Sequence, residues 1–342
     1  MPLLTAEKLI IAFHKLSDFL SRPNDNFIHL IESSANHNAW FQPAEVKRAI
    51  SALREMLQAD ALDTWFEEIT IAEVPKTVGL ILAGNIPLVG FHDILCVLAT
   101  GNHALIKMSS SDSQLLPALL QELIRIEPLL AGRISYAERL KDFDAIIATG
   151  SNNTSRYFDY YFGKVPHIIR KNRNSIAVLD GNESSSEIAA LGHDIFDYFG
   201  LGCRNVSKIY VPENYALKNL FEPLESFQPI INHFKYNNNY DYNKSIFLVN
   251  TVKHFDNGFL LVKEDEALSS PLAVLYMKYY SSLEVLDQKL HSMQSEIQCI
   301  VTHTAITPGY SVTGFGQSQQ PCLWDYADNI NTIAFLNDLN KK

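Results

Sequence analysis

The sequence predicts an α/β protein built on a parallel, doubly wound sheet. Three short apolar runs, at residues 77–83, 104–107 and 145–148, have the length and composition of buried strands. Each run is followed by a polar turn and then by a segment with helical periodicity, at 89–99, 114–126 and 153–162. Strands that alternate with helices in this way are typical of parallel sheets.

The polar turns indicate where a ligand would bind. They lie at residues 84–87, 109–112 and 149–151, directly after the three strands. Ligands of parallel sheets bind at the carboxyl ends of the strands, so the shared location predicts a dinucleotide site. No Gly-x-Gly-x-x-Gly follows any of these strands, and the usual fingerprint is therefore absent. The Ser, Thr and Gly residues of the turns either bind phosphate through helix N-termini or serve as ordinary caps.

The segment before the first strand is predicted to be helical. Thr5 is a candidate N-cap for a helix whose apolar residues lie on one face. A second helix is expected near Asp25, and a third after Pro43, a residue that helices accept in the first turn. This helical segment carries acidic residues near its start and does not have the features of a signal peptide.

Composition excludes several classes of protein. A chain of 342 residues has room for two domains, and 47% hydrophobic with 19% charged residues is ordinary for a globular protein. A net charge of -10 disfavours nucleic acid as a partner, because phosphate binding needs a basic surface. The four cysteines are widely spaced without a Cys-x-x-Cys pair, so neither a zinc site nor a disulfide framework is expected. The apolar stretch 78–100 is interrupted by polar residues, and a cytoplasmic protein without a transmembrane segment is expected.

The second half of the chain predicts another α/β unit. A basic cluster at 166–175 leads into a strand at 176–179, a helix at 187–199 and a strand at 206–212. The segment 232–244 is rich in Asn and Tyr and is interpreted as a surface loop. A strand at 271–279, a helix at 282–293 and a strand at 298–302 follow, and 330–339 is left as a short strand or helix.

Cys203 is the candidate nucleophile of this second unit. It lies between a glycine turn, Gly200-Leu201-Gly202, and the pair Arg204-Asn205, at a junction between a helix and a strand. The alternative is a buried structural cysteine, which is the common case for a single Cys. His167 and His193 are not assigned a role, because most single histidines in such positions are structural.

Five short motifs follow one another along the chain. They are Gly84-Asn85-Ile86-Pro87, Ile106-Lys107-Met108-Ser109, Ala148-Thr149-Gly150-Ser151, Gly202-Cys203-Arg204-Asn205 and Ser270-Pro271-Leu272-Ala273-Val274. In this order the motifs resemble those of the aldehyde dehydrogenase superfamily, and most closely those of its acyl-CoA reductase branch, the fatty acyl-CoA reductases of bacterial bioluminescence. The resemblance covers residues 74–301, about two thirds of the chain. The resemblance implies an aldehyde dehydrogenase-like fold with two parallel three-layer α/β domains and a helical N-terminus.

The resemblance also implies a domain division and a set of site residues. Residues 1–172 would form the helical N-terminus and the Rossmann-like cofactor domain, 173–305 the catalytic cysteine domain, and 306–342 a segment that packs on the cofactor domain or at a subunit interface. Cys203 matches the nucleophile, and Asn85 matches the side chain that completes an oxyanion hole with the Cys203 N–H. The cofactor residues would be Lys107, which matches the lysine at the adenosine ribose, together with Ser109, Ser110, Thr149, Gly150 and Ser151.

Two departures from the family pattern narrow the expected reaction. The hydrolytic members carry a glutamate base about thirty residues before the cysteine, where this chain has Arg170-Lys171-Asn172-Arg173-Asn174. Without that base, transfer of an acyl group to water is disfavoured. The glutamate that binds the cofactor ribose falls at Ala267, next to Glu266.

The expected function is therefore reduction of an acyl-CoA to an aldehyde, with NADPH as cofactor, NADH as the alternative, and no metal. Two interpretations of the basic run 170–173 stay open: a phosphate site for coenzyme A or NADPH, and a solvated loop. Arg204 also has two open interpretations: its charge favours the Cys203 thiolate, or it forms a salt bridge elsewhere. Two other functions stay open: an acyl-phosphate reductase of the glutamyl-phosphate type, and a catalytically silent partner subunit. A homodimer is also left open.

Overall fold

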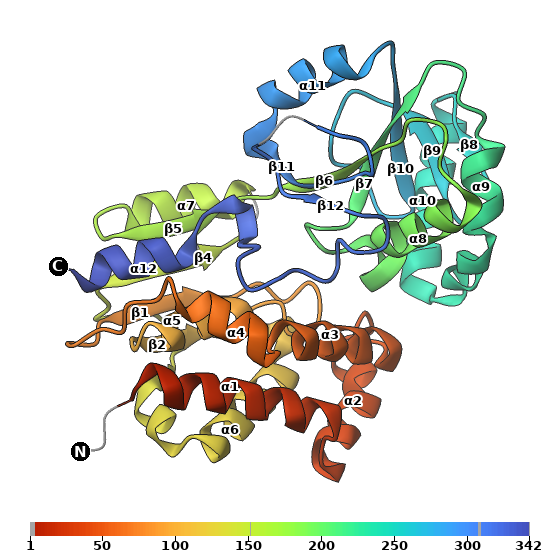
Figure 1. Ribbon diagram of the computed structural model, residues 1–342. Coiled ribbons are helices and arrows are strands. Elements are labelled where there is room, and N and C mark those ends of the chain that lie inside the picture. Colours follow the sequence, from red (N-terminus) through yellow and green to blue (C-terminus); the bar gives the residue numbers. More distant parts are fainter. Residues whose placement is uncertain (1–3, 151, 307–308, 342) are drawn as a thin grey trace. The chain divides into compact units, whose positions relative to one another are not determined.

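The chain forms two compact units in the computed structural model, which describes residues 4–150, 152–306 and 309–341 (Figure 1). The first unit contains residues 1–172 and 320–342, and the second contains residues 173–319. The expected C-terminal segment 306–342 is thus divided, because 306–319 belongs to the second unit and 320–342 to the first.

Four helices open the first unit. They are α1 (Ala6–Ser21), α2 (Asp25–His37), α3 (Pro43–Met56) and α4 (Ala59–Phe66). Thr5 caps α1 by accepting a hydrogen bond from the Lys8 N–H, and Asn24 caps α2 by accepting one from Phe27 at 2.9 Å. The first three helices confirm the sequence prediction, whereas α4 was not distinguished as a separate helix.

A five-stranded parallel sheet is the centre of the first unit. Its order is β3-β2-β1-β4-β5. The strands are β1 (Thr77–Ile81), β2 (His103–Lys107), β3 (Ile134–Tyr136), β4 (Ala145–Thr149) and β5 (His167–Arg170). The chain runs outward from β1 through β2 to β3 and then returns to the other side of β1 at β4. The strand order therefore reverses between β1 and β4, where doubly wound sheets bind their ligands.

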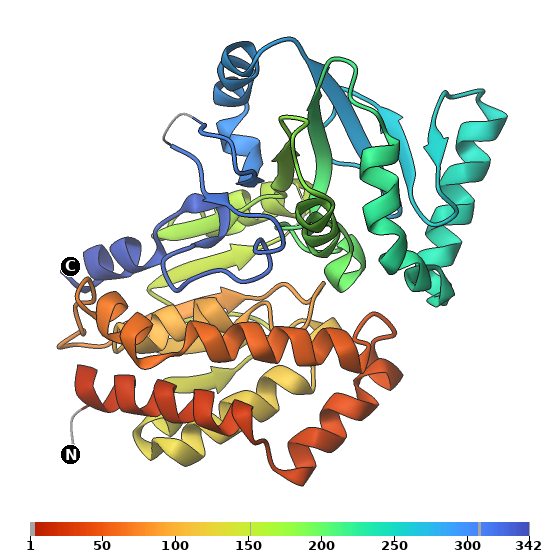
Figure 2. The ribbon, with the colours of Figure 1, turned by 45° about the vertical axis from the view of Figure 1, so that its right-hand side comes forward.

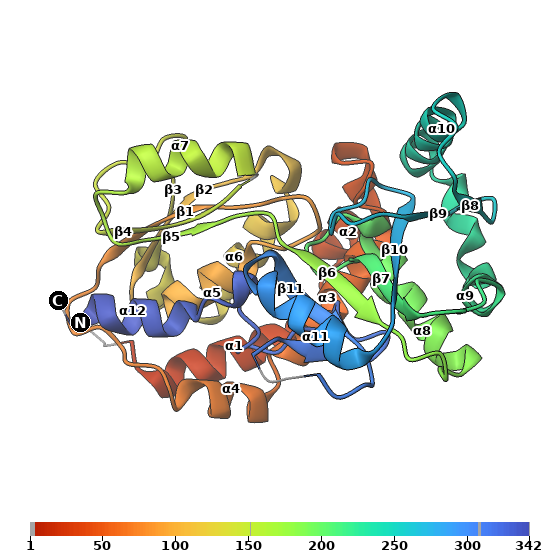
Figure 3. The same ribbon diagram turned by 90° about the horizontal axis from the view of Figure 1, so that it is seen from above.

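Helices cover both faces of this sheet. They are α5 (Phe91–Ala99), α6 (Leu115–Ile126), α7 (Asn152–Phe162) and α12 (Thr332–Asn340). Viewed from above, α7 lies on one face, while α5, α6 and α12 lie on the other (Figure 3). The core is formed by the buried face of the sheet, by α5 and α6, and by the inner faces of α1 and α3. The strand and helix prediction for this region is confirmed, and β3 and β5 are additional strands.

A seven-stranded sheet is the centre of the second unit, in the order β12-β11-β6-β7-β10-β9-β8. The strands are β6 (Asn174–Val178), β7 (Val206–Pro212), β8 (Phe255–Asp256), β9 (Leu261–Glu264), β10 (Val274–Tyr280), β11 (Ile297–Val301) and β12 (Val312–Thr313). All neighbouring pairs are parallel except β8 with β9.

The second sheet also has helices on both faces (Figure 2). The helices are α8 (Ser185–Phe196), α9 (Lys218–Leu224), α10 (Phe234–Val249) and α11 (Leu283–Ser292). Side chains of α8 and α9 pack on one face, and Leu286 and Leu290 of α11 pack on the other. Each unit is therefore a three-layer α/β structure.

Two sequence predictions in the second unit were wrong. The segment 232–244, interpreted as a surface loop, forms most of α10, whose buried residues Tyr236, Tyr240, Asn243 and Phe247 follow helical spacing. The helix predicted at 187–199 ends at Phe196, because Tyr198 and Phe199 have left-handed backbone angles. None of the helices in the described parts of the chain is both long and apolar enough to cross a membrane.

Candidate active site

Cys203 is exposed, in a short connection between α8 and β7. After Asp197, three consecutive residues of the connection lie in the left-handed region, Tyr198 (φ 54°), Phe199 (φ 58°) and Gly200 (φ 78°). Such angles are costly for residues other than glycine and persist where the surrounding structure holds them. The chain thereby leaves the helix abruptly and places the thiol at the amino end of β7.

Asn205 closes the turn that contains the cysteine. Its backbone N–H donates to the Gly202 carbonyl at 3.0 Å, and its side-chain Oδ1 accepts from the Gly202 N–H at 2.8 Å. Its Nδ2 donates to the carbonyls of Asp194 at 3.1 Å and Asp197 at 2.8 Å. One buried side chain thus ties the turn around Cys203 to the end of α8.

Ser175 holds Cys203 from the neighbouring strand β6. Its hydroxyl donates to the Cys203 carbonyl at 3.0 Å and lies 3.1 Å from Sγ of Cys299 on β11. Burial raises the pKa of Cys299 to about 11, and the charge of Arg204 opposes this shift. Cys299 is therefore a neutral thiol at pH 7. Since the single Ser175 proton is donated to Cys203, the Cys299 S–H donates to Ser175.

The predicted cofactor residues lie along the carboxyl edge of the first sheet. The register aligns Ile81 of β1 with Lys107 of β2 and with Ala148 of β4. Lys107 is exposed there, and Thr149 and Gly150 follow Ala148 directly. Ser151, the last residue of that predicted turn, lies outside the described residues. The sheet therefore brings the three predicted turns to one edge.

The turns after β1 and β2 touch each other at Gly84. A Cβ atom on Gly84 would lie 2.3 Å from Oγ of Ser109, so only glycine allows this approach. Ser109 caps a short 3-10 helix, Ser110–Asp112, whose first residue Ser110 is exposed. The buried Asp112 carboxylate accepts from the Leu88 N–H at 2.8 Å and holds the turn after β1 from the other side.

A hollow of about 450 Å³ lies beside Lys107, in the size range of small-molecule sites. It is lined by Ile106, Lys107, Met108, Tyr136, Ala137 and Glu138, at the ends of β2 and β3. It offers one cation, one carboxylate and the aromatic ring of Tyr136. The cation suits a phosphate group, the aromatic ring suits a flat base, and the carboxylate suits a sugar hydroxyl.

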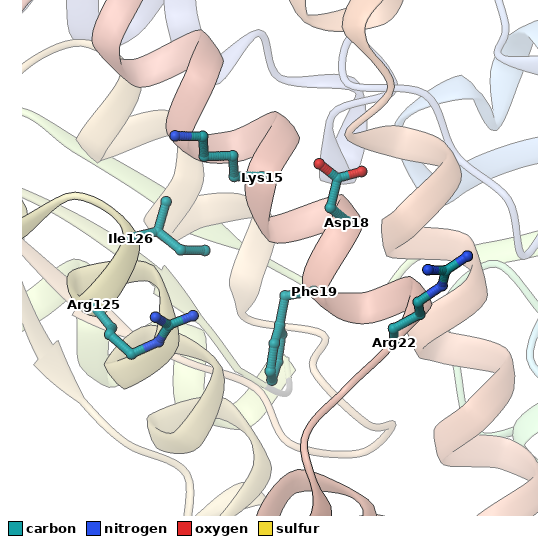
Figure 4. Close-up of a pocket in the computed structure, with 6 residues that line it drawn as sticks. All are labelled: Lys15, Asp18, Phe19, Arg22, Arg125 and Ile126. Atoms are coloured by element: carbon teal, nitrogen blue, oxygen red, sulfur yellow. The ribbon is translucent and has the colours of Figure 1, made fainter.

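Another hollow, of about 500 Å³, lies between α1 and α6 (Figure 4). Its walls are Lys15, Asp18, Phe19, Arg22, Arg125 and Ile126. Arg125 is already held by Glu122 through a two-pronged ion pair. None of the predicted site residues lines this hollow.

Asn85 is exposed in the turn after β1, in the first unit, whereas Cys203 belongs to the second. Their expected pairing in one oxyanion hole stays a prediction.

Comparison with known proteins identifies the family. The model of the family described as Acyl-CoA reductase (LuxC) matches residues 25–226, more than half of the chain. The chain belongs to the acyl-CoA reductase (LuxC) family. A long-chain acyl-protein thioester reductase 2 of Photobacterium leiognathi is 27% identical over 185 residues, which is 47% of this chain and 38% of that protein.

Solved structures show that this LuxC-family chain has the aldehyde dehydrogenase fold. Aldehyde dehydrogenase 21 of Physcomitrella patens, in complex with succinate, matches with a TM-score of 0.67 at 14% identity, over 98% of this chain and 84% of that one. The Mycobacterium tuberculosis aldehyde dehydrogenase complexed with NAD+ matches with a TM-score of 0.65 at 14% identity, over 91% of this chain and 77% of that chain. The predicted fold class and the predicted acyl-CoA reductase family are confirmed.

The place of the missing glutamate holds a buried arginine. Arg170 ends β5 and forms an ion pair with Asp93 of α5, and its Nη2 donates to Thr332 of α12 at 3.0 Å. Only 4% of the Arg170 side chain is exposed. Arg170 is thus not part of an exposed phosphate-binding loop, while the neighbouring Lys171 side chain is exposed.

The segment around Ala267 is fixed by lysines. The Lys208 ammonium group donates to the backbone carbonyls of Asp265, Glu266 and Ala267 at 2.8 to 3.2 Å. Burial lowers the pKa of Lys208 to about 8. The Glu266 carboxylate pairs with Lys278 and Lys289, at 2.7 and 2.6 Å. Glu266 therefore already has two cationic partners on β10 and α11.

The two unassigned histidines have local partners. Nδ1 of His193 lies 3.1 Å from Asp197, and its ring packs edge-on against Phe227. Nδ1 of His167 lies 2.8 Å from the Val165 carbonyl. Neither contact gives these histidines a catalytic role.

A charged cluster lies at the carboxyl ends of β6 and β11. His303 faces Asp180 and Glu183 with Nε2, at 3.3 and 3.9 Å, and Glu187 with Nδ1, at 3.1 Å. Asp180, Glu183 and His303 are spaced closely enough to hold a metal ion. A protonated His303 between these carboxylates accounts for the same arrangement, since the hydrogen bond to Glu187 raises the pKa of His303.

Proposed function

We propose that this protein is an NADPH-dependent acyl-CoA reductase that releases an aldehyde through a thioester on Cys203. The observation that carries the proposal is an exposed thiol in a turn held by Asn205 and Ser175. Membership in the acyl-CoA reductase family supports the substrate class. The Photobacterium relative is named for the reduction of a long-chain acyl-protein thioester, and such a thioester presents the same reacting carbonyl group.

In the first step the Cys203 thiolate attacks the carbonyl carbon of the acyl thioester. The carbonyl π electrons move to oxygen, and the resulting oxyanion is stabilised by the Cys203 N–H and the Asn85 side chain. Collapse of this intermediate expels the coenzyme A thiolate and leaves the acyl group on Cys203.

In the second step the acyl-enzyme is reduced. A bound reduced nicotinamide supplies the hydride. The same donors stabilise the new oxyanion on the thiohemiacetal of Cys203. Cleavage of the carbon–sulfur bond then releases the aldehyde and restores the Cys203 thiolate.

NADPH is the favoured cofactor because the end of β2 is cationic. Dinucleotide sites that select NAD place an acid against the ribose 2′-hydroxyl, whereas a cation accommodates the 2′-phosphate of NADP. Here the strand ends in Lys107, and exposed Ser110 follows. The nearby Asp112 carboxylate is buried and accepts the backbone N–H groups of Leu88 and Leu116.

The replacement at Arg170 supports reduction over hydrolysis. A base that activates water needs a proton-accepting side chain near the acyl group. Arg170 stays charged and is already bonded to Asp93. Hydride transfer to the acyl-enzyme requires no such base.

The test is the absorbance of NADPH with short-chain and long-chain acyl-CoA in turn. The proposal predicts NADPH oxidation and aldehyde formation with an acyl-CoA and loss of both in Cys203→Ala. Oxidation with acyl phosphate alone would replace the proposal by an acyl-phosphate reductase. No oxidation with any acyl donor would favour a catalytically silent subunit.

A further inference from the structure

We infer that Asn205 and Ser175 are positioning residues that fix the two peptide groups beside Cys203, and thereby hold the Cys203 N–H ready to donate to a substrate carbonyl oxygen. The inference rests on the proposed function in one respect, since it requires Cys203 to attack a carbonyl group. Both residues act through the backbone of Cys203.

The peptide group between Gly202 and Cys203 is fixed by Asn205. The Asn205 N–H donates to the Gly202 carbonyl, which belongs to that peptide group, at 3.0 Å. In a trans peptide the C=O and N–H bonds point in opposite directions, and no cis peptide bond occurs among the described residues. With its carbonyl oxygen turned toward Asn205, this peptide group directs the Cys203 N–H away from the inside of the turn.

The Asn205 side chain prevents the turn from rotating as a whole. Its Oδ1 accepts from the Gly202 N–H, so Gly202 is held through both its N–H and its carbonyl. Its Nδ2 is anchored to the carbonyls of Asp194 and Asp197. Only 4% of Asn205 is exposed. This anchor stabilises the left-handed backbone that connects α8 to the turn.

The peptide group between Cys203 and Arg204 is fixed by Ser175. The Ser175 hydroxyl donates to the Cys203 carbonyl, and Ser175 is fully buried on β6. The Cys299 thiol fixes the direction of that hydroxyl, because it donates to Ser175 Oγ. The peptide groups on both sides of Cys203 are therefore held by buried side chains or by the closed turn.

This arrangement predicts a separation between two reactions of the same thiol. Attack on a carbonyl group creates an oxyanion, and a preorganised N–H stabilises it at no further cost of reorganisation. Alkylation by iodoacetamide displaces iodide from carbon and creates no oxyanion. Loosening the Cys203 backbone should therefore slow acylation much more than alkylation.

The experiment compares these rates in the full chain carrying Cys322→Ser, which removes the other exposed thiol. Acylation of Cys203 by p-nitrophenyl acetate and alkylation by iodoacetamide are measured by intact mass. Ser175→Ala and Asn205→Ala are compared with Thr302→Val. The Thr302 control loses a buried hydroxyl that donates to the Val178 carbonyl at 2.8 Å. This contact lies at the carboxyl ends of β6 and β11, whereas Ser175 lies near the amino end of β6.

We expect the rate of acylation to fall by about 10- to 100-fold in Ser175→Ala and Asn205→Ala. Removal of a whole oxyanion donor lowers kcat by about 10²- to 10³-fold, and these variants only loosen the donor. The rate of alkylation should change by less than about twofold. Thr302→Val should keep both rates. Equal losses in both reactions, or no loss in acylation, would overturn the inference. If Asn205→Ala does not fold, Ser175→Ala decides alone.

The probe also separates this inference from the proposed function. The ester requires neither coenzyme A nor NADPH. If the variants show the predicted loss of acylation but the protein oxidises no NADPH with acyl-CoA, the positioning roles are supported and the proposed reaction is refuted. A chain whose Cys203 accepts no acyl group from the ester would lose both.

Discussion

We propose that the choice between the two nicotinamide cofactors depends on Lys107. Its side chain is exposed at the end of β2 and lines the hollow that Tyr136 and Glu138 border. A cation at this point interacts with a 2′-phosphate but gains little from an uncharged ribose. The preference for NADPH should therefore depend on this single charge.

For Lys107→Met we expect the KM for NADPH to rise about tenfold or more, because loss of a charge-assisted contact costs about 1.5–3 kcal/mol. The KM for NADH should change much less, and kcat should be little affected. Initial rates with both cofactors at saturating acyl-CoA measure this. An equal rise in both KM values would show that Lys107 does not contact the 2′-phosphate.

At the scale of elements, His303 joins the end of β11 to the start of α8. Its ring lies between Asp180, which follows β6, and Glu187 in the first turn of α8. Hydrogen bonds from Ser184 and His303 lower the pKa of Glu187 to about 2. The hydrogen bond to Glu187 also raises the pKa of His303 in the folded protein.

The resulting stabilisation depends on pH with a definite sign. Because the folded pKa of His303 is raised, its contribution is fully present below the unfolded value, about 6.5, and is lost as pH rises through the folded value. His303→Gln should therefore speed amide exchange over residues 180–187 relative to the native chain at pH 6, and less so at pH 9, after correction for intrinsic exchange. An effect of equal size at both pH values would contradict this.

Helices and strands could be predicted from the sequence where their buried residues are plainly apolar. The strand predicted at 206–212 coincides with β7, because its run of apolar residues is buried in the centre of a sheet. Helix α10 was missed because its buried stripe is made of Tyr236, Tyr240, Asn243 and Phe247, only one of which is plainly apolar. Strand β5 has only four residues within a basic run, and its last residue, Arg170, is buried through an ion pair that the sequence does not show.

The candidate site could be located in the sequence only where its residues are consecutive, and its chemical roles stay predictions. The motif around Cys203 and the turns after β1, β2 and β4 could be located because each is a short local pattern. The contacts of Ser175 with Cys203 and Cys299 could not be predicted, because they join residues 28 and 124 positions apart. Register between β6, β7 and β11 creates these contacts, and register is a property of the folded sheet.

At the scale of the whole chain, one buried ion pair connects distant parts of the sequence within the first unit. Arg170 at the end of β5 bonds to Asp93 of α5 and to Thr332 of α12. The adjacent Lys171 N–H donates to the Asp328 carboxylate at 3.0 Å. These contacts hold the C-terminal residues 320–342 against the unit formed by residues 1–172.

Removal of one partner should be much more damaging than removal of both. We expect Arg170→Met to cost about 3–5 kcal/mol, because it leaves a buried carboxylate unpaired, and Arg170→Met with Asp93→Leu to recover most of that loss. Urea unfolding followed by tryptophan fluorescence measures this in the first unit, which contains Trp40, Trp65 and Trp324. Additive losses in the double variant would show that the two charges are not coupled.

In the proposed reaction an acyl group passes through Cys203 on its way to an aldehyde. Its most direct test is intact mass measurement of the protein mixed with a long-chain acyl-CoA in the absence of NADPH. We predict the mass of one acyl group on Cys203, and its disappearance with release of one aldehyde when NADPH is added. Cys203→Ala should show neither event. Aldehyde formation by Cys203→Ala at the unaltered rate, or stable acylation at another residue only, would contradict the account.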